Sequence, residues 1–383
     1  MDLRGAGVGG NQHLRSDLVS APLQFGRFFL PGPTEVHPDV LAAQTGPMIG
    51  HRGAAIHDLM ARIDDGLRPL FLTERPVFVS TSSATGLMEA SVRNGVVGGR
   101  VLSLVNGAFS SRFAEIALTC GFDVDAWEVT WGDVHSPEQV ADRLAAGGYD
   151  AVTVSHSETS TGALQDLEAI ASVVDQSEET LLLVDSVTGV PGLETRTDEW
   201  GIDFILTGSQ KALALPPGLA FGVASEAMMD RSENAPGRGW YFALDRLMSE
   251  LVKNQTPATP ALSLLYGLDV QLARIAEEGI ENRWKRHLAM QERTIEWIEE
   301  MKEVGVGIDT FAVEGHRSPT VTCISMPDGD GASATVAEML DRGWVIGGGY
   351  GKLTESTIRI GHMGDHTVDE LDPLLAELGD VLG

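Results

Sequence analysis

Residues 180–186, TLLLVDS, and residues 203–209, DFILTGS, are two short apolar runs that each end in small polar residues. Neither run alternates apolar with polar positions, which is typical of strands buried on both faces of a sheet. Four comparable runs occupy residues 76–81, 100–105, 150–156 and 219–225. Helix-like segments such as SPEQVADRLAAGG, residues 136–148, separate the runs. The sequence therefore predicts an α/β fold, with a mainly parallel sheet covered by helices.

The last third of the chain has a different order of elements. A long stretch with helical spacing, residues 260–305, precedes two strand-like segments and a final amphipathic helix. This order predicts a smaller α+β domain, which the long helical stretch links to the first. We expect a flexible N-terminal extension at residues 1–22, a large domain at 23–275 and a small C-terminal domain at 276–383.

The composition excludes several classes of partner. Acidic residues outnumber basic ones by 55 to 27, for a formal net charge of −28, so phosphate backbones and anionic lipid surfaces would be repelled. The acids are spread along the chain and predict a hydrated acidic shell, which suits a salt-rich cytoplasm. Two distant cysteines, Cys120 and Cys323, form no disulfide framework or metal motif. We therefore expect a cytoplasmic protein that binds neither nucleic acid nor membranes.

Lysine is rare in this chain, with five among 383 residues, yet Lys211 follows directly after the run at 203–209 and a single glutamine. The run at 180–186 carries Asp185 at its end. Ligands in open α/β sheets bind beyond the carboxyl ends of the strands, so the two side chains could share one cleft. Pyridoxal phosphate requires such a pair, a lysine for a covalent bond and a carboxylate against its ring nitrogen. A surface lysine and a helix-capping aspartate are the plainer alternatives.

Two further segments follow strands and could complete such a site. SSATGLMEA opens a helix, so the backbone N–H groups of Ser83, Ala84 and Thr85 could hold a phosphate, although helix capping explains the segment equally well. Phe109 in NGAFSSR could stack on a flat ring, or it could pack in the core.

Two more polar positions are candidates. A hydroxyl of SHSETSTGAL, such as that of Thr159, could bond a ring oxygen, or the segment could be an ordinary Ser/Thr turn. Arg359 lies in an apolar strand, STIRIGHMG, where a buried cation requires a partner. A substrate carboxylate bound in bidentate fashion and a structural salt bridge are equally consistent with its position.

Together these residues resemble the class V aminotransferases of fold-type I, in particular the alanine:glyoxylate and serine:glyoxylate (serine:pyruvate) branch. The resemblance runs from about residue 28 to the C-terminus. LVDSVTG followed by GSQKALALPPG is the most specific match. The supporting stretches are FLPGPTEVHPDVL, MIGHRG, SSATGLMEA, NGAFSSR, HSETSTG and STIRIGHMG.

The resemblance implies a role for each candidate. Lys211 is the lysine that bonds to the cofactor, and Asp185 is the carboxylate beside the pyridine nitrogen. Phe109 stands where relatives often carry a stacking Trp, Thr159 contacts the ring oxygen, and Arg359 binds the α-carboxylate of the substrate. The residues that hold the phosphate are Ser83, Ala84, Thr85 and Gln210.

The resemblance also implies a homodimer with shared sites. Thr256 and Thr259 are the candidates for reaching the phosphate of a neighbouring subunit, in a segment where relatives carry a Tyr that this chain lacks. Two segments near the N-terminus, Pro31-Gly32-Pro33 and Gly50-His51-Arg52, lie where family members shape the substrate pocket, and no specific role is implied for His51 or Arg52.

The implied activity is a ping-pong transamination from alanine or serine to glyoxylate or pyruvate. Aspartate-, phosphonate- and ureidoglycine-type aminotransferases, and a lyase, remain alternatives on the same scaffold. A cysteine desulfurase is disfavoured, because Cys120 falls in a helix-like stretch and Cys323 in a strand. A nucleotide-dependent oxidoreductase lacks its GxGxxG motif. A non-catalytic binding protein of this fold need not have kept Lys211 and Asp185.

Overall fold

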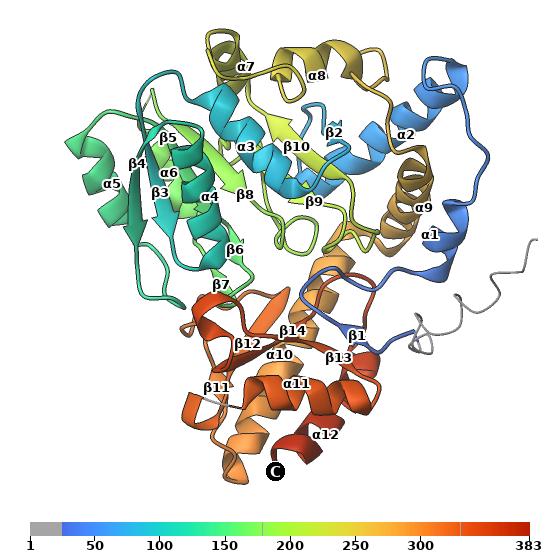
Figure 1. The fold of residues 1–383 in the computed structure, drawn as a ribbon, viewed down its shortest axis with the longest axis vertical. Helices are drawn as coiled ribbons and strands as arrows, with labels where there is room; N and C mark the ends of the chain where they lie inside the picture. The colour runs from blue at the N-terminus through green and yellow to red at the C-terminus, as the bar shows by residue number, and fades with distance from the viewer. Residues whose placement is uncertain (1–24, 178, 330) are drawn as a thin grey trace, which may run out of the picture.

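The computed structural model of the protein describes residues 25–177, 179–329 and 331–383. The predicted extension at residues 1–22 lies outside the described residues. The described chain forms a larger part around a seven-stranded sheet and a smaller part around a five-stranded sheet (Figure 1). This arrangement confirms the predicted α/β fold with a smaller α+β part.

The large sheet is parallel except at one strand, β10, which runs antiparallel to both of its neighbours. Six of its strands are the predicted apolar runs. The seventh, β4, was not predicted, because it lies at the edge of the sheet and its residues DVDAWE are all exposed or half-buried. In spatial order the strands are β2 (Phe78–Ser80), β10 (Ala220–Ala224), β9 (Phe204–Gly208), β8 (Leu181–Asp185), β5 (Tyr149–Ser155), β3 (Arg100–Val105) and β4 (Asp123–Glu128).

Successive residues of the central strands enter two different hydrophobic cores. In β8, Leu182 and Val184 join one core, whereas Leu181 and Leu183 join the other. Side chains alternate between the faces of a sheet, so a strand buried on both faces must be apolar throughout. This explains the uninterrupted apolar runs in the sequence.

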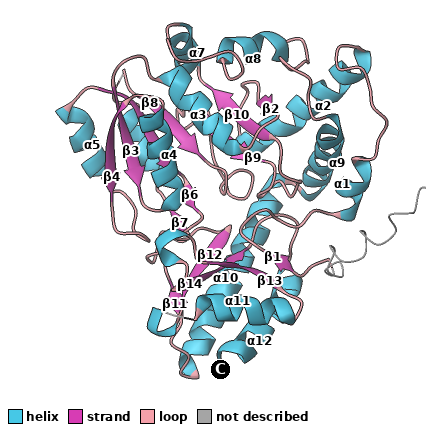
Figure 2. Cartoon of the chain, in the orientation of Figure 1, coloured by secondary structure: helices cyan, strands magenta, loops and turns pink. Residues whose placement is uncertain are grey.

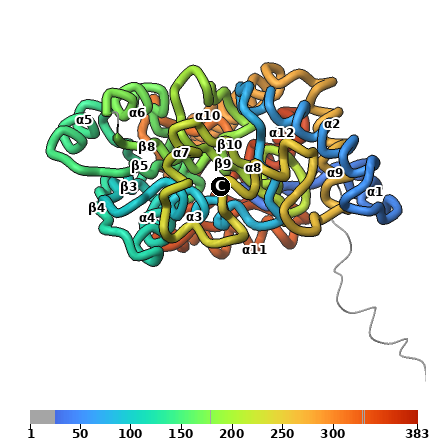
Figure 3. Tube along the Cα trace, turned by 90° about the horizontal axis from the view of Figure 1, so that it is seen from above, coloured from blue at the N-terminus to red at the C-terminus, as the bar shows by residue number. Residues whose placement is uncertain are grey.

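Helices cover both faces of the large sheet, and Figure 3 shows α6 and α4 on opposite sides of the strands. The first core contains residues of α1 (Pro38–Ala43), α2 (Ala54–Phe71), α5 (Pro137–Ala146), α6 (Leu167–Val174) and α9 (Leu262–Glu278). The second core contains residues of α3 (Ala84–Gly95), α4 (Ala108–Thr119), α7 (Glu226–Glu233) and α8 (Leu244–Leu251). A short hairpin, β6 (Ser157–Glu158) and β7 (Ala163–Leu164), follows β5.

The smaller part packs its sheet against three helices, as Figure 2 shows. Its strands, in spatial order, are β1 (Phe28–Phe29), β13 (Val345–Gly348), β14 (Thr357–Gly361), β12 (Val321–Ser325) and β11 (Asp309–Thr310). Its helices are α10 (Ile280–Glu303), α11 (Ala332–Asp341) and α12 (Val368–Leu382). Residues 28–29, which the predicted boundaries assign to the large domain, pair with β13 of the small sheet.

The long helical stretch that we expected between the two parts is two helices, not one. Gly279 ends α9 and begins α10 with a backbone φ of +82°, a conformation that glycine adopts at little cost. Within the described residues, no helix combines the length and the hydropathy that crossing a bilayer requires.

Candidate active site

Lys211 lies just beyond the C-terminal end of β9, where the large sheet faces the segment that leads out of β1. Its side chain is 8% exposed, and its Nζ donates a hydrogen bond to the carbonyl oxygen of Pro31. Gly32 allows this approach, because a Cβ at Gly32 would lie 2.5 Å from Cδ of Lys211. A surface lysine is therefore excluded, and Gly32 leaves room for the lysine side chain.

Asp185, the last residue of β8, is also buried. Its two carboxylate oxygens accept hydrogen bonds from the Val187 N–H at 2.9 Å and from the Ser155 hydroxyl at 3.2 Å. Ser155 is its direct neighbour on β5. Burial raises the pKa of Asp185 to about 6, with a smaller contribution from the charge of Glu158 and a partial offset from the bond to Val187.

Burial has the opposite effect on Lys211, because it disfavours the charged form of an amine. It lowers the pKa of Lys211 to about 7, and the positive charge of Arg359 adds to the effect, while Asp185 and Glu158 oppose it. A large fraction of the amine is therefore neutral near pH 7. The neutral form is the nucleophile that attacks a carbonyl carbon.

Arg359, in β14 of the small sheet, is 9% exposed. Its guanidinium donates to the carbonyl oxygens of Gly348 at 2.8 Å and Thr159 at 3.3 Å. No carboxylate of the described residues forms an ion pair with it, although Glu158 attracts it at longer range. A buried guanidinium without an acid is costly, so its surroundings favour a carboxylate ligand over a structural salt bridge.

Phe109 occupies the first turn of α4, and its ring centroid lies 6.0 Å from Nζ of Lys211. Glu158, fully buried, fixes this turn by accepting hydrogen bonds from the N–H groups of Phe109 and Ser110 and from the Ser110 hydroxyl. A carboxylate at a helix N-terminus is stabilised by the unpaired N–H groups and by the helix dipole. The N-terminus of α4 is therefore already occupied by an acid.

The N-terminus of α3 differs from that of α4. Its N-cap residue, Ser83, makes no side-chain capping bond within the described structure, whereas Ser136, Asp166 and Ser225 all cap their own helices. The side chain of Gln210 reaches the same place: a Cβ at Gly208 would lie 2.8 Å from its Oε1 and 3.3 Å from Cβ of Ala84. The turn at Ser83, Ala84 and Thr85, with Gln210 beside it, is therefore a helix terminus that could receive a phosphate.

Thr159 lies one residue beyond β6 and is buried. Its hydroxyl bonds to the hydroxyl of Thr188, and its carbonyl oxygen accepts from Arg359. Thr159 thus connects the hairpin after β5, the loop after β8 and the small sheet.

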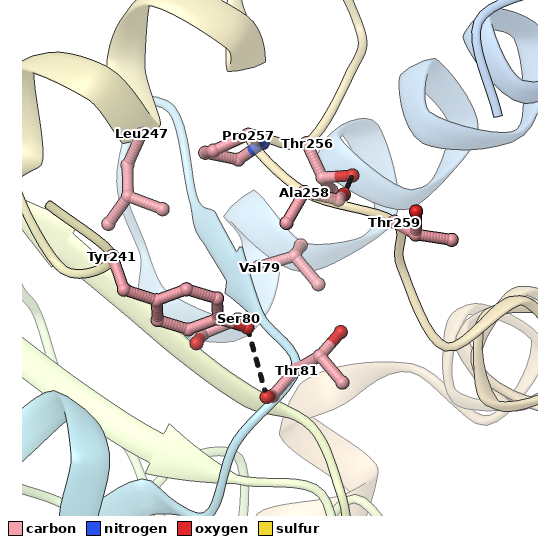
Figure 4. A pocket seen from close by; sticks show the side chains of 9 residues that line it. All are labelled: Val79, Ser80, Thr81, Tyr241, Leu247, Thr256, Pro257, Ala258 and Thr259. Atoms are coloured by element: carbon pink, nitrogen blue, oxygen red, sulfur yellow. Dashed lines mark hydrogen bonds between the residues drawn. The ribbon is translucent and has the colours of Figure 1, made fainter.

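Thr256 and Thr259 do not join this group. They line a separate pocket together with residues at the end of β2, just before α8, in α8 and just after it (Figure 4): Val79, Ser80, Thr81, Tyr241, Leu247, Pro257 and Ala258. The Thr256 hydroxyl donates to the carbonyl oxygen of Ala258 at 2.7 Å, and Thr259 is exposed. The exposed Arg52 donates to the carbonyl oxygen of Thr256 at 2.7 Å. His51 is half-buried.

Two residues that the sequence did not single out, Glu158 and Tyr350, also belong to the site, and Pro31 makes a contact there that the sequence does not predict. Glu158 orients Phe109, the carbonyl oxygen of Pro31 holds the lysine amine, and Tyr350 stacks on Phe109 with 5.2 Å between ring centroids. Glu158 is the single acid in the polar segment HSETSTG, and this was a sequence signal that could have identified it. The position of Tyr350 follows from the packing of the two sheets and carries no local signal.

The fold and this set of side chains define an aminotransferase of the class V family. The family model described as "Aminotransferase class-V" matches residues 42–367, so the chain belongs to this family. It is 39% identical over 344 residues to an uncharacterized aminotransferase of Methanocaldococcus jannaschii, a match that covers 88% of this chain and 87% of the relative.

Two of the similar proteins are named as glyoxylate aminotransferases. A serine–glyoxylate aminotransferase of Methylorubrum extorquens is 32% identical over 364 residues, covering 92% of this chain and 89% of the relative. The crystal structure of an alanine–glyoxylate aminotransferase from Nostoc sp. superimposes with a TM-score of 0.89 at 31% identity, covering 99% of this chain and 100% of that one. Both matches cover nearly the whole of this chain.

The residues present fit pyridoxal phosphate, the cofactor that this family implies. The buried amine of Lys211, with a pKa of about 7, could react with an aldehyde, and the buried carboxylate of Asp185 is close enough to affect its pKa. The α3 N-terminus, whose N-cap Ser83 makes no side-chain capping bond within the described residues, could receive the phosphate. These are the chemical groups that the aldehyde, the ring nitrogen and the phosphate each require.

Proposed function

We propose that this protein transfers the amino group of alanine or serine to glyoxylate or pyruvate in a ping-pong reaction with pyridoxal phosphate. The names of the serine–glyoxylate and alanine–glyoxylate relatives support these substrates. We further propose a cytoplasmic homodimer, in which Thr256 and Thr259 face the phosphate site of the neighbouring subunit.

The single observation that carries the proposal is Arg359, a buried guanidinium without an acidic partner among the described residues, whose charge depresses the pKa of Lys211. A substrate carboxylate would supply the missing partner, with two parallel hydrogen bonds. Amino acids and 2-oxo acids share this carboxylate, so one arginine serves both halves of a ping-pong reaction.

The cofactor, when bound, supplies an electron-withdrawing ring that spreads the negative charge left at the substrate carbon. Lys211 would hold the cofactor covalently until the donor displaces it. Its freed Nζ would then act as the general base that takes the α-proton of the donor, and afterwards as the general acid that releases a proton. A pKa near 7 suits an amine that must accept and release a proton in turn.

Other residues of this chain would hold the groups in place. Asp185, fixed by Val187 and Ser155, would stabilise a positive charge on the ring nitrogen. Phe109 would pack against the ring, and Ser83, Ala84, Thr85 and Gln210 would bind the phosphate. Thr159 would bond the ring oxygen through its hydroxyl.

The test is a panel of donors and acceptors measured with the purified holoenzyme. Alanine and serine should each change the visible absorbance of the bound cofactor and should each give turnover with glyoxylate or pyruvate. A holoenzyme that used aspartate, a phosphonate or ureidoglycine and ignored alanine and serine would contradict the proposed substrates. A protein that bound no pyridoxal phosphate would contradict the proposal as a whole.

A further inference from the structure

Two stacked aromatic rings lie beside the two cations of the candidate site, Lys211 and Arg359. The ring centroid of Phe109 lies 6.0 Å from Nζ of Lys211, and that of Tyr350 lies 5.7 Å from Cζ of Arg359. The two rings stack on each other, with centroids 5.2 Å apart and planes inclined by 27°. Phe109 comes from the large sheet's helix α4, whereas Tyr350 follows β13 of the small sheet.

Tyr350 is held at this place from two sides. Its hydroxyl accepts a hydrogen bond of 2.8 Å from Arg112, one helical turn after Phe109 on α4. Its own loop has little freedom, because a Cβ at Gly347 would lie 2.8 Å from Cδ of Pro31, and a Cβ at Gly349 would overlap the carbonyl oxygen of Leu353. The ring therefore contacts α4 of the large part and belongs to a closely packed segment of the small part.

This position restricts what an amino acid can carry as its side chain. A donor whose nitrogen takes the place of the Lys211 amine, and whose carboxylate reaches Arg359, must place its Cα between these two groups. The Cα then lies beside the Phe109–Tyr350 pair. We propose that Tyr350 is a specificity-determining residue, whose ring limits the amino donor to small side chains such as those of alanine and serine.

The inference rests on the proposed function. It assigns Tyr350 a role in substrate selection, which differs from a purely structural role. Tyr350 is 37% exposed, so truncation of its side chain removes a wall of the site without opening a cavity in a core. Its two features can be separated by mutation, since the hydroxyl bonds Arg112 and the ring borders the site. If the residue only ties the two sheets together, loss of the hydroxyl and loss of the ring will have similar effects.

The experiment compares kcat/KM for alanine and for leucine, with glyoxylate as the common acceptor, in three variants of the holoenzyme. Tyr350→Ala should raise the leucine-to-alanine ratio by about 10-fold or more, because a pocket distinguishes each added methylene by roughly that factor. Tyr350→Phe keeps the ring and should leave the ratio within about 3-fold of the wild-type value, a small shift on the same scale.

Lys352→Ala is the matched control, since Lys352 belongs to the same loop and faces Trp131, with 4.0 Å between Nζ and the ring centroid. It should leave the ratio unchanged. The midpoint of thermal unfolding, measured without cofactor, should be similar for all three variants.

An unchanged ratio in Tyr350→Ala, in an enzyme that still uses alanine, would overturn the inference alone. An equal change in Tyr350→Phe and Tyr350→Ala would also overturn it. A wild-type enzyme that used neither alanine nor serine would contradict the proposed function and the inference together.

Discussion

Two clusters of buried charge lie where the large and small sheets meet, and they differ in how their cations are paired. At the candidate site, Arg359 donates its hydrogen bonds to carbonyl oxygens, and no carboxylate of the described residues forms an ion pair with it. In the second cluster, Arg283, which is 1% exposed, bonds Glu278 at 2.8 Å and Asp365 at 3.0 Å. It also donates to the carbonyl oxygen of Ala212 at 2.7 Å, one residue after the candidate catalytic lysine.

The carboxylates of the two clusters titrate in opposite directions. Burial raises the pKa of Asp185 to about 6. Burial alone would also raise the pKa of Asp365, but the charge and hydrogen bond of Arg283 lower it below its ordinary value. Removing an acid from a buried, paired cation destabilises the fold, whereas a buried cation that has no acid is available to a ligand. Pairing thus distinguishes a structural cluster from a functional one.

The largest effect is expected from the unpaired cation. Arg359→Leu should lower kcat/KM for the amino donor by about 100-fold or more, because the substrate carboxylate loses a charged, bidentate partner. The free energy of unfolding of the protein without substrate should not fall, since no acid is left unpaired. Steady-state kinetics and urea unfolding together measure both quantities.

Arg342→Leu is the matched control for that change. Arg342 lies on the surface at the end of α11 and pairs with Glu338 and Glu377. Its loss should leave kcat/KM unchanged. If Arg359→Leu instead unfolded the protein with little effect on substrate binding, Arg359 would belong with Arg283 as a structural residue.

The paired cluster should show the reverse pattern. Asp365→Ala should lower the free energy of unfolding by about 3 kcal/mol or more near neutral pH, because it leaves Arg283 buried with one acid fewer. Asp372→Ala removes an exposed partner of Arg293 and should cost less than about 1 kcal/mol. Urea unfolding of both variants measures the difference. Equal losses would show that burial and pairing do not set the stability of this junction.

The smallest effect concerns pH. Because Asp185 has a raised pKa in the folded chain, the unfolded chain releases this proton first as the pH rises. The apoprotein should therefore lose stability relative to Asp185→Asn between the ordinary pKa of 3.8 and about 6. The difference should reach at most about 3 kcal/mol above that window.

Asp365 should act in the opposite sense in the same titration. Because the pKa of Asp365 is lowered in the folded chain, its carboxylate stabilises the fold at pH values above the ordinary pKa of 3.8. This contribution is lost as the pH falls. Urea unfolding of the wild type, Asp185→Asn and Asp365→Ala at a series of acidic pH values tests the sign of both effects. Parallel pH profiles for wild type and Asp185→Asn would contradict the account of Asp185.

The sequence predicted the centre of the fold and of the site because both depend on local signals. Apolar runs identify strands buried on both faces, and the ends of adjacent parallel strands place Asp185 and Lys211 near each other. The exposed edge strand β4 lacks this signal. The pairing of β1 with β13 and the contact of Arg112 with Tyr350 join segments more than 200 residues apart, and no periodicity in either segment predicts them.

The role of Lys211 can be measured directly. The protein would be incubated with pyridoxal phosphate, reduced with borohydride and digested, and the peptide that carries the fixed cofactor would be identified by mass spectrometry. We expect the label on the peptide that contains Lys211, with none on the peptides of the other four lysines, Lys253, Lys285, Lys302 and Lys352. A label on any of those four, or no label at all, would contradict the account.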